Sequence, residues 1–268
     1  TNFFRQRDPI VKTIILAGGW GTRLGQHTDW IPKPMVQIGD KPMIWHIMKL
    51  YAHFGFHDFI VSAGVKAHVI KEYFLNYEAY SSDFTRDFST GTIEFYPYDS
   101  EIDWRVSALD TGLNTLKGAR IKRVERYLTD ETNMVTYGDG LANIDISQLV
   151  DFHHSHGKLV TITGVRPPAR FGEITESSGR VTKFSEKSQA SSGLINGGFM
   201  VFQREFLNHL SIEEDCDLEF DVMENLARCG EVMVYKHTGS WECIDHGRDL
   251  VNLNALWNSS RAFWKIWK

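Results

Sequence analysis

The chain has few of the features that mark secreted, membrane-spanning or zinc-bearing proteins. Of its 268 residues only three are cysteines, Cys216, Cys229 and Cys243, and none belongs to a C-x-x-C pair. An odd number of widely spaced cysteines argues against a disulfide framework and against a structural zinc site. No apolar run reaches the roughly 20 residues needed to span a membrane, and the polar start from Thr1 to Lys12 lacks a signal peptide's apolar stretch. We therefore expect a cytoplasmic protein.

Positive charge is also in short supply. The net charge is −5, so no basic field indicates a nucleic-acid partner. A small anionic substrate would have to be bound by local cations. The hydrophobic fraction of 42% and the charged fraction of 24% are typical of a globular chain that buries one large core.

A cluster of three histidines, His153, His154 and His156, raises the question of a metal site. On a helix, His153 and His156 would share one face, but no acidic or cysteine ligand stands beside them in a metal motif. We expect instead an exposed helix end that runs into Gly157.

Short apolar runs alternate with helical patterns along the chain. The patterns predict strands at Val11–Ala17, Phe59–Ala63, Met134–Tyr137 and Leu159–Val165, and helices at Pro42–Phe54, Ala67–Asn76 and Ile146–His156. This alternation indicates an α/β fold, a Rossmann-like, mainly parallel sheet with flanking helices. Ligands of such sheets sit outside the carboxyl ends of the strands, where the glycines after the first strand and Asp139 would both lie.

Two segments depart from this alternation. Tyr77–Asp110 is polar and aromatic, and Gly91 separates the candidate strand arms Phe84–Phe88 and Thr92–Tyr98, so we expect a hairpin or flap insertion. The tail from Leu250 is helical in pattern and rich in tryptophan, so we expect it to pack on its own domain or on a neighbouring subunit. Both segments favour a homo-oligomer.

The glycine-rich turn at Leu16–Leu24 is the most informative segment. Glycines after a strand let backbone amides approach phosphate oxygens. A dinucleotide fingerprint would need glycine where Leu24 stands, and a Walker loop would need lysine after Gly21. What remains is a phosphate cradle with two nearby cations, Arg23 and Lys33, the second held in a stiff Pro-Lys-Pro segment. The alternative is a glycine turn that only packs closely, with both cations solvated.

The same residues resemble the sugar-phosphate nucleotidyltransferases, and within them the glucose-1-phosphate cytidylyltransferases. The family's opening signature L-A-G-G-x-G-T-R-L stands at Leu16–Leu24, and its P-K-P-M-V segment at Pro32–Val36. The similarity continues at Lys41–Met48, Val69–Phe74, Leu109–Gly112, Thr136–Gly140, Arg170–Gly172 and Ile195–Phe199. The resemblance implies a nucleotide-diphospho-sugar transferase-like fold in one domain, residues 1–268. Its nucleotide-binding half would be residues 12–165, its acceptor-binding half 166–249 and its aromatic tail 250–268.

The implied reaction joins CMP from CTP to a phosphorylated acceptor, such as glucose 1-phosphate, and releases pyrophosphate. By resemblance Mg²⁺ is the cofactor, and Asp139 and Asp245 are the metal carboxylates. Each carboxylate taken alone has an ordinary interpretation, a turn residue between glycines for Asp139 and a surface group for Asp245. The acceptor phosphate is already an anion, so no general base is needed.

The resemblance also assigns the remaining site residues. Arg23 and Lys33 would be catalytic. The nucleotide would be bound by Leu16, Ala17, Gly18, Gly19, Gly21, Thr22, Asp110, Thr111, Gly112 and Gly138. The acceptor would be bound by Gly172, Glu186, Lys187, Asn196, Gly197, Glu219 and His246.

Departures from the family pattern fall on the acceptor side. Ser188 replaces a common proline, Leu218 and Val222 replace a tryptophan and a proline around Glu219, and His246 replaces a threonine. Because a pocket that hydrogen-bonds hydroxyls discriminates strongly, the acceptor could be another sugar phosphate or a smaller phosphorylated compound.

Two further alternatives stay open. One is the same chemistry with UTP or dTTP. The other, from a different class, is a non-catalytic nucleotide-binding regulatory module, although such a module need not keep Arg23, Lys33 and both metal carboxylates. An NAD-dependent oxidoreductase is disfavoured by Leu24.

Overall fold

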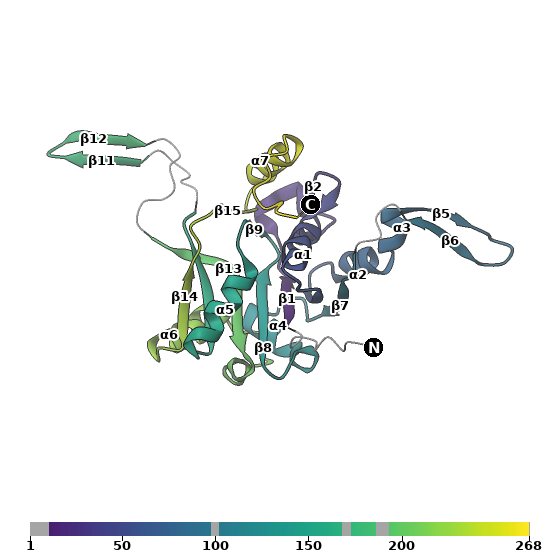
Figure 1. The fold of residues 1–268 in the computed structure, drawn as a ribbon, viewed down its shortest axis with the longest axis horizontal. Coiled ribbons are helices and arrows are strands. Elements are labelled where there is room, and N and C mark those ends of the chain that lie inside the picture. The colour runs from purple at the N-terminus through teal and green to yellow at the C-terminus, as the bar shows by residue number, and fades with distance from the viewer. Residues whose placement is uncertain (1–10, 98–101, 168–172, 186–192, 268) are drawn as a thin grey trace, which may run out of the picture.

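A seven-stranded sheet forms the centre of the molecule (Figure 1). The computed structural model describes residues 11–97, 102–167, 173–185 and 193–267. The strand order is β14 (Val232–Lys236), β10 (Val160–Val165), β13 (Ile195–Gln203), β8 (Thr132–Tyr137), β1 (Lys12–Ala17), β4 (Asp58–Ala63) and β7 (Arg105–Asp110). Only β13 runs antiparallel to its neighbours, so the mixed, mainly parallel sheet is confirmed.

The sheet is buried on both faces because side chains alternate along each strand. On β1, Ile15 and Ala17 point into one core, while Ile14 and Leu16 point into the other. The first core is covered by α1 (Met43–His53), α2 (Ala67–Leu75), α5 (Ile146–His156) and α7 (Gly247–Asn258). The second is covered by α4 (Lys117–Arg123), α6 (Glu224–Arg228), the 3₁₀ helix η4 (Arg204–His209) and the π-helix η5 (Leu218–Met223).

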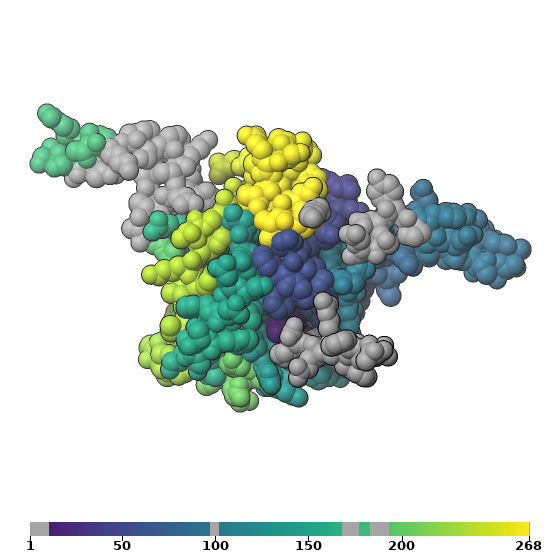
Figure 2. Space-filling view, viewed as in Figure 1, coloured from purple at the N-terminus to yellow at the C-terminus, as the bar shows by residue number. Residues whose placement is uncertain are grey.

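Smaller elements complete the described chain. Four two-stranded sheets pair β2 (Gln37–Ile38) with β3 (Lys41–Pro42), β5 (Ser82–Arg86) with β6 (Ile93–Pro97), β9 (Gly140–Ala142) with β15 (Trp241–Cys243), and β11 (Glu173–Ser177) with β12 (Arg180–Ser185). The short helices are η1 (Thr22–Thr28), η2 (Lys33–Met35), α3 (Tyr77–Ser81) and η3 (Glu125–Tyr127). Figure 1 shows the β5–β6 and β11–β12 hairpins extending beyond the body on opposite sides, and Figure 2 shows the β5–β6 hairpin as a projection of the surface. Within the described ranges, no helix has the length and apolarity to cross a membrane.

The predicted elements are confirmed, and the predicted flap is confirmed only at its centre. The arms are β5 and β6, and Gly91 adopts a φ of +77° between them. The flanks of the prediction were wrong, because Tyr77–Ser81 is helical and Arg105–Asp110 is an edge strand of the main sheet. The edge position of this strand explains the error. Among the described residues it pairs with β4 alone and none of its side chains is fully buried, so its sequence is too polar to indicate a strand of the main sheet.

The histidine cluster also differs from the prediction of an exposed helix end. Gly157 does end α5, with a φ of +65°. His153, however, is fully buried, with Nδ1 2.8 Å from Thr161 Oγ1. Burial, and then the neighbouring His156 and His154, lower the pKa of His153 to about 4. His153 is therefore a neutral core residue.

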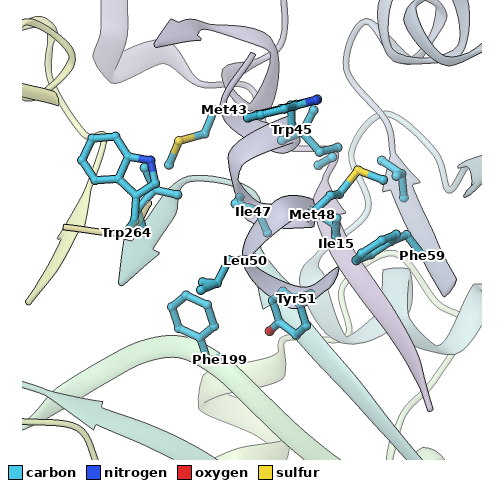
Figure 3. Close-up of a cluster of buried hydrophobic side chains, with 14 of the residues drawn as sticks. Ile15, Met43, Trp45, Ile47, Met48, Leu50, Tyr51, Phe59, Phe199 and Trp264 are labelled. Atoms are coloured by element: carbon cyan, nitrogen blue, oxygen red, sulfur yellow. The ribbon is translucent and has the colours of Figure 1, made fainter. Parts of the chain in front are cut away.

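The aromatic tail packs on its own chain, which is one of the two predicted arrangements; the other was packing on a neighbouring subunit. Trp264 is fully buried beside α1 (Figure 3). Its indole Nε1–H donates to His46 Nδ1 (3.3 Å), and His46 Nε2–H donates to the Ile38 carbonyl (3.0 Å). Trp267 lies edge-on against Trp45, with ring centroids 5.9 Å apart. The tail thus stabilises the helix that supports β1.

Candidate active site

A cavity of about 580 Å³ opens at the carboxyl end of the parallel strands. Its lining comes from three places, the turn after β1, the loop that leads into α4, and the end of β8. The lining residues are Leu16–Arg23, Lys33, Pro34, Leu113–Lys117, Arg120 and Tyr137–Asp139. The first and last of these places hold residues that the sequence analysis assigned to the nucleotide and the metal, and those roles stay predictions.

The turn after β1 can be built only with glycine at two positions. A Cβ on Gly18 would lie 2.2 Å from the guanidinium carbon of Arg120. Gly21 adopts a φ of +67°, a left-handed conformation that L side chains avoid, and it precedes η1. The turn thus brings its backbone close to the cavity, as a phosphate cradle requires.

Two carboxylates meet at the cavity because of a short strand pairing. Asp139 is separated from the end of β8 by Gly138 alone, and β9 begins at the next residue. β15 pairs antiparallel with β9, with Cys243 opposite Gly140, and Ile244 N–H donates to the Asp139 carbonyl (2.9 Å). This register places Asp245 next to Asp139 although the two are far apart in sequence.

Lys33 links the two carboxylates. Its Nζ lies 2.6 Å from Asp139 Oδ2 and 3.1 Å from Asp245 Oδ1. Burial opposes the charged form, but Asp139 and then Asp245 outweigh it, so the pKa of Lys33 is raised. Arg23 Nη1 reaches Asp245 Oδ2 (3.0 Å), while most of its side chain, 67%, stays exposed. Arg23 and Asp139 therefore lie at one site, as the phosphate-cradle interpretation requires.

The carboxylate pair fits a hard divalent cation. Asp139 and Asp245 already share one positive group, and both offer only oxygen donors. Mg²⁺ commonly takes one or two carboxylates and fills its other positions with water and substrate phosphates. Burial, and then Asp139 and Asp245, raise the pKa of the adjacent Cys243 thiol to about 12. That thiol is neutral at physiological pH and does not compete as a soft ligand.

Arg120 is a site residue that sequence reasoning missed. Its guanidinium is buried and donates to the Gly18 carbonyl (2.9 Å), the Ala63 carbonyl (3.1 Å) and the Gly112 carbonyl (2.9 Å). These three carbonyls follow or end β1, β4 and β7, so one side chain holds three strand ends together. Nothing in its helical sequence context distinguishes it from the other basic residues of α4.

The predicted segment Asp110–Gly112 supports the cavity but does not line it. Thr111 is buried, and its hydroxyl donates to the Ala63 carbonyl (2.7 Å) and accepts from Arg120 (2.7 Å). Asp110 is exposed, and its Oδ1 accepts from the Gly112 amide (3.0 Å). The next residues, Leu113–Lys117, form the wall. Nucleotide binding by Asp110–Gly112 stays a prediction.

Two of the predicted acceptor residues, Asn196 and Glu219, contact Tyr137, which sequence reasoning also missed. Tyr137 Oη donates to Glu219 Oε1 (2.6 Å) and accepts from Asn196 Nδ2 (3.1 Å). Asn196 reaches this edge because β13 runs antiparallel and begins there. The Gly197 carbonyl accepts from Trp241 Nε1 (2.9 Å). His246 is exposed at the start of α7. Gly172, Glu186 and Lys187 lie outside the described residues.

Comparison with known proteins decides the family. The nucleotidyl transferase family profile matches residues 12–263. The chain belongs to this family. It is 43% identical to a glucose-1-phosphate cytidylyltransferase of Salmonella typhi, over 96% of this chain and the whole of that protein. It is 41% identical to a protein of Bacillus subtilis named "Probable glucose-1-phosphate cytidylyltransferase", with the same coverage.

The fold comparison agrees with the sequence comparison. The structure of apo UDP-glucose pyrophosphorylase matches with a TM-score of 0.67 at 17% identity, covering 94% of this chain and 99% of that one. A match at this identity shows the shared fold alone. Together the family match and the close relatives confirm the resemblance read from the signature, and the chain is a nucleotidyltransferase enzyme.

Proposed function

We propose that the enzyme transfers CMP from CTP to a sugar 1-phosphate, glucose 1-phosphate first among them, and releases pyrophosphate. The relatives at 41% and 43% identity support the nucleotide and the acceptor. The observation that carries the proposal is the contact of Lys33 with both Asp139 and Asp245 beside the glycine turn. A module that only bound nucleotides would not need this second carboxylate.

The chemistry follows from the charges at the site. An oxygen of the acceptor phosphate attacks the α-phosphorus of CTP and forms a new P–O bond. The bond from the α-phosphorus to the oxygen that bridges to the β-phosphate breaks, and pyrophosphate leaves with that electron pair. Because two polyanions must meet, the main task of the protein is charge neutralisation and alignment.

The described residues can divide that task. We assign the triphosphate to the backbone of Leu16–Thr22 and the end of β8 at Gly138. Arg23, with its long and mostly exposed side chain, would neutralise the leaving pyrophosphate. Lys33 would contact the α-phosphate once substrate phosphates compete for it. The acceptor-binding half, residues 166–249, would contribute Asn196, Gly197, Glu219 and His246, together with the predicted Gly172, Glu186 and Lys187.

Mg²⁺ is the cofactor that the carboxylates fit. Held by Asp139 and Asp245, it would withdraw charge from the substrate phosphates when bound. The three free cysteines and the use of CTP fit a cytoplasmic enzyme, where we place it.

A pyrophosphate-release assay tests the proposal. CTP, UTP and dTTP are each supplied with Mg²⁺ and with glucose 1-phosphate, other sugar 1-phosphates and smaller phosphorylated compounds. We expect CTP with glucose 1-phosphate to give the highest kcat/KM. Equal rates with the three nucleotides would remove the cytidylyl assignment, and a better acceptor would replace glucose 1-phosphate. Absence of pyrophosphate release in every combination would contradict nucleotidyl transfer.

A further inference from the structure

Lys117 lines the same cavity but takes no part in the phosphate and metal side of the site. It begins α4. Its ammonium forms an ion pair with Glu219 and lies 5.1 Å from the centroid of the Tyr137 ring. Its side chain is 43% exposed, so it remains accessible to a ligand in the cavity.

The partners of Lys117 belong to the acceptor side of the site. Glu219 Oε1 accepts from Tyr137 Oη, which in turn accepts from Asn196. The ion pair therefore closes a chain of polar groups that runs from α4 to β13. By contrast, the groups that face the triphosphate, Arg23 and Lys33, pair with the two metal carboxylates. Lys117 has no contact with that second group.

We propose that Lys117 and Glu219 together determine acceptor specificity by binding neighbouring hydroxyl groups of the acceptor. This inference rests on the proposed function. A carboxylate offers only acceptors and an ammonium only donors, so the pair can satisfy both hydrogen-bonding capacities of a diol at once. A site built to hydrogen-bond a hydroxyl discriminates against an analogue that lacks it, because the polar groups of the site lose that partner.

Leu218 and Val222, the two departures from the family pattern on either side of Glu219, pack inside the protein. Both side chains are buried in the second core, so they hold η5 in place and do not line the cavity. The side chain of Asp217 caps η5 by accepting from the amides of Glu219 and Phe220. Glu219 is thus fixed at the start of η5, where Lys117 can meet it.

Steady-state kinetics of Lys117→Met test the assignment. Methionine keeps an unbranched apolar side chain of similar length but removes the donor. We expect the KM for glucose 1-phosphate to rise on the order of tenfold to hundredfold, while the KM for CTP changes less than about threefold. With deoxy analogues of the acceptor, each lacking one hydroxyl, wild type and variant should become alike for the analogue that lacks the bound hydroxyl.

Lys158→Met is the matched control. Lys158 pairs with Glu231 (3.1 Å) at nearly the same exposure, 39% and 31% against 43% and 31%, but it is not among the residues that line the cavity. This variant should keep both KM values. Glu219→Gln should raise the KM for the acceptor, and the double variant should be less than additive because both changes break one pair.

The outcomes separate this inference from the proposed function. An active wild type with an unchanged acceptor KM in Lys117→Met would overturn the inference alone. A rise in the KM for CTP that matched the rise for the acceptor would also overturn it and move Lys117 to the nucleotide side. A wild type that transfers no nucleotide to any sugar 1-phosphate would overturn both.

Discussion

At the scale of single residues, the site depends on side chains that have little freedom to change. Asp139 and Asp245 share one ammonium, and Arg120 fills the space that a Cβ on Gly18 would need. Each of these groups is held by partners from distant parts of the chain. We therefore expect substitution of a carboxylate to lower the catalytic rate, and substitution of a tightly packed glycine to lower the free energy of unfolding.

The substitution Asp139→Asn should lower the catalytic rate without unfolding the protein. It leaves the volume of the side chain unchanged but removes one of the two charges that would hold the cation. We expect kcat to fall on the order of 100-fold or more, with a melting temperature within a few degrees of wild type. Asp130→Asn, at a side chain that is 98% exposed, is the control and should behave as wild type. Full turnover in Asp139→Asn would disprove its role as a metal ligand.

The substitution Gly18→Ala should lower the free energy of unfolding. Its new methyl group would meet the buried Arg120 guanidinium, which five hydrogen bonds hold in place. Overpacking of this kind costs about 1–3 kcal/mol. Gly19→Ala is the matched control, because a Cβ there meets nothing within 4 Å. Urea unfolding should show a lower midpoint for Gly18→Ala only, and equal midpoints would refute the packing argument.

At the scale of the elements, α1 joins the first core to the C-terminal tail. His46 on this helix accepts from the Trp264 indole and donates to the Ile38 carbonyl, so only its neutral form satisfies both partners. A second proton on Nδ1 would face the indole N–H. Burial accordingly lowers the pKa of His46 to about 4, despite its hydrogen bond to Ile38.

The lowered pKa of His46 predicts a loss of stability in mild acid. The unfolded state binds a proton as the pH falls through 6.5, whereas the folded state resists until about 4. The contribution of His46 to the free energy of unfolding should therefore be fully present above pH 6.5. It should fall by about 3 kcal/mol as the pH is lowered from 6.5 to 4. Unfolding free energies across this range would measure the fall. His46→Gln should flatten it relative to the exposed control His68→Gln, and superposable curves would contradict the assignment.

The burial of each strand decided whether it could be predicted from the sequence. Strands buried on both faces, such as Lys12–Ala17 and Asp58–Ala63, appear as plain apolar runs and were predicted. The edge strand Arg105–Asp110 was not, because none of its side chains is fully buried. His153 was misjudged for a related reason, since its burial depends on Thr161 of the neighbouring strand.

Residues of the candidate site could be predicted from the sequence only where they belong to the family's sequence motif. The glycine turn, Arg23, Lys33 and both carboxylates followed from the family motif, and the structure brings these residues together. Arg120, Lys117 and Tyr137 did not, because their roles come from strand order and loop packing. A lysine at the start of a helix looks the same in sequence whether it meets solvent or Glu219.

At the scale of the whole molecule, the β5–β6 hairpin stands apart from both cores. It exposes large apolar side chains, with Phe84 49%, Phe88 85% and Tyr96 49% accessible. Exposed apolar surface of this kind marks interaction sites, and we keep the prediction that the chain forms a homo-oligomer with the hairpin as a contact.

Shortening the hairpin tests that prediction. Replacing residues 83–96 by an Asn-Gly turn removes the projecting part and keeps the paired ends Ser82 and Pro97. The melting temperature of the isolated chain should change little, because neither core loses a residue. Light scattering should show a smaller assembly than wild type. An unchanged mass would exclude the hairpin as the contact.

The β9–β15 pairing has a consequence for the order in which the enzyme becomes active during its synthesis. Asp245 follows β15, the last strand of the described chain, and it reaches Lys33 only when β15 has paired with Gly140–Ala142. A nascent chain can therefore form the glycine turn and most of the central sheet while it still lacks one of its two proposed metal ligands. Both carboxylates can meet at the cavity only after residue 245 has been synthesised, so copies truncated or cleaved before β15 would occupy nucleotide without turning it over.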